Sequence, residues 1–275
     1  MPQRSHSIGA TIYSLNGYPL DDLTLGWLVT GSSDWTTGTN IERTSLTTPG
    51  YDGSVIMPGR QVAPALGLTI ATPYRSLPAL VALLTQPELA ITQSGKPGSA
   101  RVLTDTSTPT RVGHGDAENT EFSVTVVLTI PGVWYRGQTE TFDVPLDAAT
   151  KTVPVFPGLS GKVGDALVRL TDVTDPKVRD SAGSWWTYTG VIPAGSYLRF
   201  DATSGKAWMT TTDAWTGGTE VDSLSLSFGP RPGFLNITPE FTLTPATRRG
   251  KLSVSTASRG DTAAVNVRGR NAYVA

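Results

Sequence analysis

The segment Glu121-Phe-Ser-Val-Thr-Val-Val-Leu-Thr-Ile130 decides the fold class, because apolar and polar residues alternate along it. Phe122, Val124, Val126 and Leu128 recur at every second position, with hydroxyl side chains at most positions between them. A period of two places the two sets on opposite faces of a β-strand. The pattern therefore predicts a strand that is buried on one face.

Shorter segments with the same alternation follow toward the C-terminus, each beside Gly or Pro turns. They centre on Leu198/Phe200, Leu224/Leu226/Phe228, Leu252/Val254 and Val265/Val267. Short strands separated by turns are typical of β-sandwiches and barrels. We therefore expect an all-β fold with little helix.

One helix is predicted, over about residues 77–85. Pro78 suits its first turn, Ser76 is placed to cap it, and Pro87 ends it. Leu80 and Leu84 belong to an apolar stripe that also includes Leu77 and Val81. The expected fold is all-β with one short helix.

The chain of 275 residues is long enough for two domains. Pro131-Gly132 interrupts the chain directly after the deciding strand, and a boundary is expected between Gly132 and Gln138. This predicts two β-sandwich domains, residues 1–137 and 138–275. Residues after about 245 could pack on either domain.

The composition excludes several classes of site. There is no cysteine, and the two histidines are His6 and His114. The sequence therefore lacks the residues needed for disulfide scaffolds and thiolate nucleophiles, and it has too few histidines for a His-rich metal cluster or for most catalytic triads. We expect no enzyme activity, no cofactor and no metal site.

Charge and hydropathy constrain the partners. The net charge of −1 provides no global attraction to nucleic acid or to anionic membranes. The strongest apolar run, Leu77 to Leu84, is too short to span a bilayer, and the first thirty residues contain no run of signal-peptide length. We expect no membrane insertion and no specific nucleic-acid binding.

A basic segment ends the chain. From residue 248 onward, Asp261 is the only acidic side chain, whereas there are six basic ones. They are Arg248, Arg249, Lys251, Arg259, Arg268 and Arg270. Such a segment could dock on an acidic neighbouring surface or on nucleic acid, or it could form ordinary solvated strands. The sequence favours solvated strands.

Aromatic residues gather between positions 185 and 215. Because adjacent Trp185 and Trp186 must point to opposite faces of a strand, at least one of them is expected in the core. The others could stack on sugar rings, with carboxylates as hydroxyl acceptors. The candidate glycan contacts are Trp186, Trp208, Trp215, Asp201 and Asp213.

Paired carboxylates would be needed for a glycosidase. Asp201, Asp213, Glu220 and Asp222 lie in the aromatic region, but most occupy turn sequences in which a short carboxylate accepts backbone hydrogen bonds. The turn interpretation is preferred, and a glycosidase is the least favoured function.

The order of several short motifs resembles the distal tail proteins of long-tailed bacteriophages, in particular those of phages that infect actinobacteria. The motifs are Gly50-Tyr-Asp-Gly-Ser-Val-Ile-Met-Pro-Gly-Arg60, Leu128-Thr-Ile-Pro-Gly-Val-Trp-Tyr-Arg136, Gly183-Ser-Trp-Trp-Thr-Tyr-Thr-Gly190 and Val265-Asn-Val-Arg-Gly-Arg-Asn-Ala-Tyr273. Together they extend over nearly the whole chain.

The resemblance implies an N-terminal belt domain, with a helix and a projecting hairpin, that assembles into a hexameric ring. It also implies a C-terminal galectin-like or carbohydrate-module-like jelly roll outside the ring. Such rings belong to the virion, at the tail tip, and assemble in the host cytoplasm. The implied partners are further copies of the chain, the tail tube protein, the tail-associated hub protein and host-adhesion components.

Ring contacts are expected in the first domain, where pairing between neighbouring copies would cover open strand edges. The candidates are the loop from Tyr51 to Arg60, including Asp52, and a hairpin from Ser94 to Arg111, including Arg101. The alternative function is a carbohydrate-binding module that recognises host cell-wall glycans. The two functions could coexist, since weak sites on a ring gain avidity.

Overall fold

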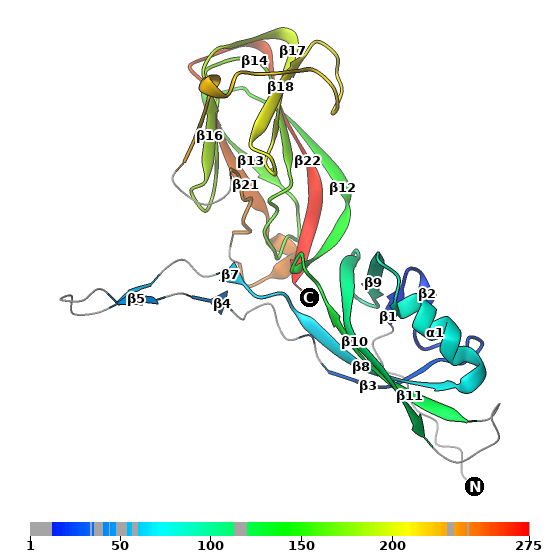
Figure 1. Cartoon of the computed structure of the whole chain (residues 1–275). Coiled ribbons are helices and arrows are strands. Elements are labelled where there is room, and N and C mark those ends of the chain that lie inside the picture. The colour runs from blue at the N-terminus through cyan, green and yellow to red at the C-terminus, as the bar shows by residue number, and fades with distance from the viewer. Residues whose placement is uncertain are drawn as a thin grey trace. The chain divides into compact units, whose positions relative to one another are not determined.

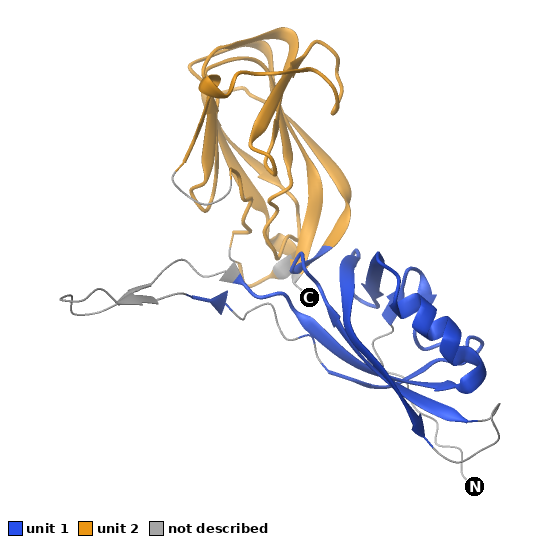
Figure 2. Cartoon of the chain, viewed as in Figure 1, with its two compact units in different colours: residues 1–135, 274–275 blue, residues 136–273 orange. Residues whose placement is uncertain are grey.

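The structure is a computed structural model of the whole chain, and it describes residues 13–33, 35, 41–43, 45–47, 54–56, 60–112, 120–229, 234–240 and 242–274. The chain divides into two compact units (Figure 2). Unit 1 comprises Met1–Tyr135 with Val274–Ala275, and unit 2 comprises Arg136–Tyr273. Each unit is described separately below.

Unit 1 is built on a seven-stranded antiparallel sheet in the order β2-β1-β9-β10-β11-β8-β3 (Figure 1). Its strands are β1 (Tyr13–Leu15), β2 (Tyr18–Pro19), β3 (Leu28–Ser32), β8 (Ala65–Pro73), β9 (Leu89–Gln93), β10 (Ala100–Val112) and β11 (Glu121–Thr129). The strand predicted from the alternating segment is confirmed as β11. Its Val124, Val126 and Leu128 are fully buried.

The predicted helix is confirmed as α1 (Leu77–Leu84), preceded by the 3-10 turn η1 (Tyr74–Ser76). Pro78 lies in its first turn as expected, but the Ser76 side chain makes no capping hydrogen bond. Leu80 and Leu84 are buried as predicted, Leu83 is buried as well, and Leu77 and Val81 are only half-buried. The buried leucines shield the buried face of the sheet from water.

Two short pairs of strands lie among the described residues between positions 41 and 61 of unit 1. They form two separate antiparallel ladders, β4 (Ile41–Glu42) with β7 (Arg60–Gln61), and β5 (Ser45–Thr47) with β6 (Ser54–Ile56). The sequence predicted a loop from Tyr51 to Arg60, and β6 and the start of β7 correct this prediction. We call residues 41–61 the arm.

Unit 2 contains two antiparallel sheets. The six-stranded sheet has the order β12-β22-β14-β17-β18-β19, and the five-stranded sheet has the order β13-β21-β15-β16-β20. The six-stranded sheet comprises β12 (Trp134–Pro145), β14 (Leu167–Thr174), β17 (Val191–Asp201), β18 (Lys206–Thr210), β19 (Thr219–Glu220) and β22 (Ser258–Val274). The five-stranded sheet comprises β13 (Thr150–Val155), β15 (Lys177–Asp180), β16 (Trp185–Tyr188), β20 (Leu226–Phe228) and β21 (Gly250–Ser255).

The two sheets of unit 2 pack face to face. Trp186 of the five-stranded sheet stacks on Phe200 of the six-stranded sheet, with ring centroids 4.3 Å apart. Leu252, Val265 and Val267 are fully buried, as their alternation predicted. The residues after 245 contribute β21 and β22 to these sheets, together with the 3-10 turn η3 (Pro245–Thr247).

One predicted strand position is wrong. Leu224 is 90% exposed and lies in the 3-10 turn η2 (Ser223–Ser225), and the strand begins at Leu226. The Asp222 carboxylate accepts a hydrogen bond from the Leu224 amide at 2.9 Å. A local side-chain bond of this kind offers the backbone an alternative to a sheet ladder. The all-β fold with one short helix is nevertheless confirmed among the described residues.

Candidate functional site

The arm carries the first group of predicted contacts. Arg60 lies opposite Glu42 in the ladder of β4 with β7. Tyr51 and Asp52 lie outside the described residues. The structure therefore places Arg60 on a paired strand, and the role of all three residues in ring contacts remains a prediction.

The second group, Arg101 and Arg111, lies near opposite ends of β10. The predicted hairpin from Ser94 to Arg111 is wrong in its extent, because the turn after Gln93 joins β9 to the start of β10 and the rest of β10 pairs with β11. Arg101 forms an exposed ion pair with Glu88 of the same chain at 3.7 Å. The Arg111 guanidinium donates to the Thr120 hydroxyl at 3.4 Å.

A face made mainly of small residues covers the side of β10, β11, β8 and β3 that points away from the core. One register row joins Thr108, Thr125, Thr69 and Gly31, and the next joins Thr110, Ser123, Ala71 and Leu28. The intervening residues of β8 and β11 are buried, so these rows face outward. We call these eight residues the threonine face.

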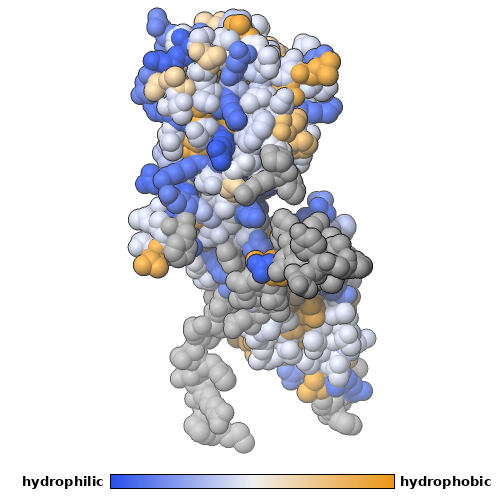
Figure 3. All heavy atoms as spheres, turned by 90° about the vertical axis from the view of Figure 1, so that its left-hand side faces the viewer, coloured by the Kyte–Doolittle hydropathy of each residue, from blue (hydrophilic) through white to orange (hydrophobic). Residues whose placement is uncertain are grey.

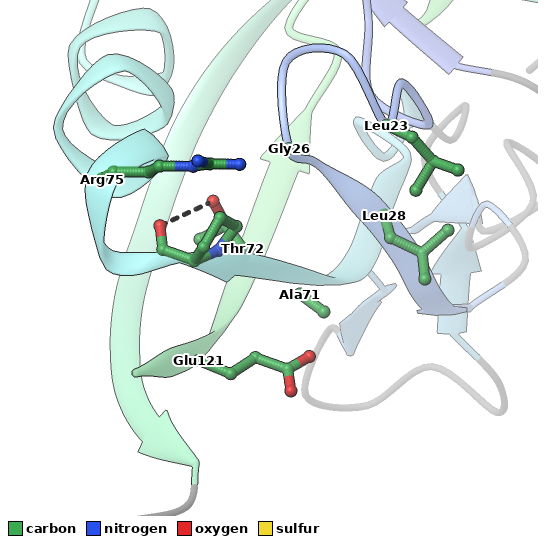
Figure 4. A pocket seen from close by; sticks show the side chains of 8 residues that line it. Leu23, Gly26, Leu28, Ala71, Thr72, Arg75 and Glu121 are labelled. Carbon is green, nitrogen blue, oxygen red and sulfur yellow. Dashed lines mark hydrogen bonds between the residues drawn. The ribbon is translucent and has the colours of Figure 1, made fainter. Parts of the chain in front are cut away.

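A shallow pocket of about 390 Å³ borders the threonine face (Figure 4). Leu23 and Leu28, which are 80% and 42% exposed, form one side of it, and Glu121 lies across from them. Small side chains allow a second sheet or loop to approach closely, and the exposed leucines provide apolar contact area. On the side of the molecule that Figure 3 shows, the exposed apolar residues form small, separate groups.

In unit 2, the structure corrects one predicted glycan contact. Trp186 is fully buried against Phe200, so it has no face available for a sugar. Its neighbour Trp185 points the other way, and the Lys177 ammonium lies 4.1 Å from its ring centroid. The expected division of this pair between the core and the surface is confirmed.

Asp201 is engaged in the turn that follows β17. Its carboxylate accepts hydrogen bonds from the Thr203 amide at 2.8 Å and from the Ser204 hydroxyl at 2.9 Å. Asp222 makes the comparable bond described above. These carboxylates stabilise turns, as the sequence predicted for most of this group.

Trp208 and Trp215 lie over arginines, although both were predicted to face a ligand. The Arg199 guanidinium lies 4.8 Å from the Trp208 ring, and the Arg169 guanidinium lies 4.7 Å from the Trp215 ring. Asp213 forms an ion pair with Arg169. The structure thus brings Trp215 and Asp213 together through Arg169, which the sequence analysis did not single out.

The sequence contains a pattern that marks these two arginines, but their proximity follows only from the strand register. Arg169 and Arg199 each stand between two apolar residues in the sequence, at positions that face away from the core. Without the pairing of β14 with β17, nothing in the sequence indicated that they lie opposite each other.

Three further properties of the described residues bear on their chemistry. Among these residues, no group of three or more His, Asp and Glu side chains could hold a metal ion. Burial raises the pKa of Tyr135 and lowers that of Lys96, and both lie in unit 1, where the Lys96 ammonium is 5.5 Å from the Tyr135 ring. Within the described part of the chain, no helix is both long and apolar enough to cross a membrane.

Comparison with known proteins gives a result only at the level of structure. No model of a known protein family matches the sequence, and no curated protein matches it. The crystal structure of the Dit (gp 19.1) protein of phage SPP1 aligns with 95% of this chain and 99% of its own, with a TM-score of 0.59 and 13% sequence identity. The chain has the fold of a Dit-like distal tail protein.

The SPP1 Dit protein is described as a paradigm of the hub adsorption apparatus of phages that infect Gram-positive bacteria. Two structures of the phage P2 baseplate in its activated conformation, with Ca and with Sr, also align, each with a TM-score of 0.36 and 10% identity. They cover 94% and 95% of this chain and 98% of their own chains. The alignment with SPP1 Dit includes both units, so the Dit-like fold describes the chain as a whole.

Proposed function

We propose that this chain is a structural virion protein, a distal tail protein that forms a hexameric ring at the tip of a long phage tail. The observation that carries the proposal is the shared fold with SPP1 Dit over 95% of the chain. The ring would join the tail tube protein to the tail-associated hub protein and support host-adhesion components. Assembly would occur in the host cytoplasm, and the protein would have no enzymatic role.

Two features of unit 1 support assembly. The arm contains two short ladders outside the seven-stranded sheet, and the threonine face offers a surface of mainly small side chains. β2 and β3 form the two edges of the sheet, and an edge strand presents unpaired backbone groups to a neighbour. We propose that ring contacts use the arm, with Tyr51, Asp52 and Arg60, and the β10 arginines Arg101 and Arg111.

A shortened arm tests this assignment. Replacing residues 44–58 with a Gly-Asn-Gly turn leaves the residues of the β4–β7 ladder in place. We expect unchanged circular dichroism and loss of the oligomer in light scattering. The control changes two exposed residues of unit 2, Val191 and Leu224, to Ser and should leave the oligomer intact. An oligomer that survives arm shortening would contradict the interface assignment.

Carbohydrate binding by unit 2 is a second candidate function. It is supported by a surface pocket of about 340 Å³ that includes the side chain of Trp215. Trp186 is excluded as a contact, and Asp213 and Asp201 are already bonded within the chain. A titration with cell-wall polysaccharides, followed by calorimetry on the assembled protein, tests this function, and no heat with any of them would contradict it.

A further inference from the structure

The outer face of the six-stranded sheet concentrates arginines. One register row crosses four strands through Asn266, Arg169, Arg199 and Trp208. Arg169 and Arg199 are only 6% and 8% exposed, so both guanidinium groups are largely removed from water. Removing a cation from water is costly unless an anion or hydrogen-bond acceptors replace the solvent.

Contacts within the chain partly compensate the charge of the buried Arg169 guanidinium. Its Nε donates to the Asn266 side chain at 3.1 Å, and it forms an ion pair with Asp213, although its Nη1 makes no well-oriented hydrogen bond. Its guanidinium also lies 4.6 Å from the Tyr197 ring and 4.7 Å from the Trp215 ring. These contacts fix the indole of Trp215 in place on the sheet.

Two other arginines of this face lack such compensation. Arg199 contacts the Trp208 ring, but its buried Nη1 has no hydrogen-bond partner, and no ion pair with a described residue neutralises it. Arg268 lies 5.7 Å from the Trp215 ring and likewise has no carboxylate partner among the described residues. The face therefore carries more guanidinium charge than the carboxylates of the described residues neutralise.

The pocket of about 340 Å³ opens beside this row. Arg268 and Arg270 of β22 contribute to its wall, together with Trp215, Leu167 and Asp165. Asp165 is the acidic member, and it is paired with Arg136 and, at 3.6 Å, with Arg270. Thr139 and Thr216 add hydroxyl groups to the rim.

The remaining carboxylates of the face are also engaged. Asp143 accepts a hydrogen bond from the Asn266 amide, and Glu220 pairs with Lys206 at 2.9 Å. Of the two arginines in the pocket wall, Arg268 is therefore the one without a carboxylate partner among the described residues. An indole ring beside a free guanidinium suits a ring-shaped ligand that carries an anionic group.

We propose that this pocket binds an acidic saccharide unit. The sugar ring stacks against Trp215, and its carboxylate or phosphate group pairs with Arg268 in the field of the neighbouring arginines. The shared chemistry is a sugar-linked anion, whether from a uronic acid or from a phosphate ester. This inference rests on the second candidate function, carbohydrate binding, and it is independent of ring assembly.

Calorimetric titration of the full chain tests the proposal. Three probes are compared, namely oligogalacturonate, a sugar phosphate and a neutral galacto-oligosaccharide of matched length. We expect binding of at least one anionic probe, at least tenfold tighter than the neutral one and weakened by salt. The anionic probe that binds identifies whether the source is a carboxylate or a phosphate.

Variants locate the site. Trp215→Ala and Arg268→Gln should each weaken the anionic probe at least tenfold. Arg179→Gln, a change of an exposed arginine on the other sheet, should leave binding unchanged. Thermal unfolding and native mass of each variant confirm that the fold and the assembly are intact.

Two results would overturn the proposal in different ways. Equal binding of neutral and anionic probes, unaffected by Arg268→Gln, would contradict the acidic ligand but preserve carbohydrate binding. No binding of any probe would contradict both. Neither result affects the ring, which the native mass of the same samples measures separately.

Discussion

Trp185 and Trp186 are neighbours in the sequence but occupy different environments. Trp186 is fully buried against Phe200, and Trp185 contacts Lys177 at the surface. The sequence predicts that the two side chains diverge, because adjacent residues of a strand face opposite sides. It does not show which one faces inward, since that depends on how β16 pairs with β15 and β20.

Replacement of Trp186 and of Trp215 by alanine should distinguish a core position from a surface position. We expect Trp186→Ala to lower the free energy of unfolding by about 3 to 5 kcal/mol, because a large buried side chain is replaced by a cavity. Trp215→Ala, on the partly exposed loop after β18, should cost far less. Urea denaturation followed by circular dichroism measures both, and equal losses would contradict the packing of unit 2.

Glycine 250 offers a second residue-scale test. A Cβ at this position would collide with Cγ2 of Ile237 and would approach Val155 and Leu159 closely. We expect Gly250→Ala to destabilise the protein by about 1 to 3 kcal/mol through overpacking. Gly132, whose added Cβ would meet nothing within 4 Å, is the matched control. Thermal melts that place both variants at the wild-type value would contradict the close approach.

The pair of Asp147 with Lys151 predicts a pH dependence. The Lys151 ammonium donates to the Asp147 carboxylate at 2.9 Å, and this bond holds the pKa of Asp147 below its ordinary value of 3.8. A lowered pKa means that the ionised form stabilises the folded state above pH 3.8, and that this stabilisation is lost as the pH falls below 3.8.

Asp147→Asn should therefore melt slightly below the wild type at pH 7, and the difference should disappear in strong acid. The effect should be small because the pair is exposed. Melting temperatures of both proteins between pH 2 and pH 7 measure it. A difference that grows toward low pH would have the wrong sign for a stabilising carboxylate.

At the scale of elements, strong periodicity predicts the structure correctly. β11 and α1 were predicted within one residue of their observed limits, because each carries its own apolar pattern and its own Pro or Gly boundary. The segment around Leu224 was predicted as strand because three apolar residues alternate there. The bond from the Leu224 amide to Asp222 turns the chain instead, and alternation alone does not reveal this competition.

The hairpin from Ser94 to Arg111 shows another limit at this scale. Lys96-Pro-Gly98 marks the turn correctly, and the Lys96 amide donates to the Gln93 carbonyl at 3.0 Å. The sequence did not show that only the first residues of β10 pair with β9, because its Thr-rich second half has little apolar signal and pairs with β11 instead. Cross-strand pairing, rather than local sequence, determines how far such a strand extends.

At the scale of the whole molecule, the sequence analysis named only some of the residues that the structure brings together on the outer face of the six-stranded sheet. Trp215 and Asp213 were singled out from aromatic and acidic clustering, and the structure places them on the arginine-rich face of unit 2. Arg169, Arg199 and Arg268 lie far apart in the sequence and meet only through the register of β14, β17 and β22. Because strand pairing over long sequence distances leaves no local sequence pattern, the sequence alone did not predict that these arginines lie close together.

The central claim is that the chain assembles as the hub ring of a phage tail. Native mass spectrometry of the purified full chain over a concentration series tests it most directly. The subunit mass is 29.1 kDa, and we expect one discrete species of six subunits, or two such rings stacked, that does not grow further. A strict monomer at every concentration, or an open-ended series of oligomers, would contradict the closed ring.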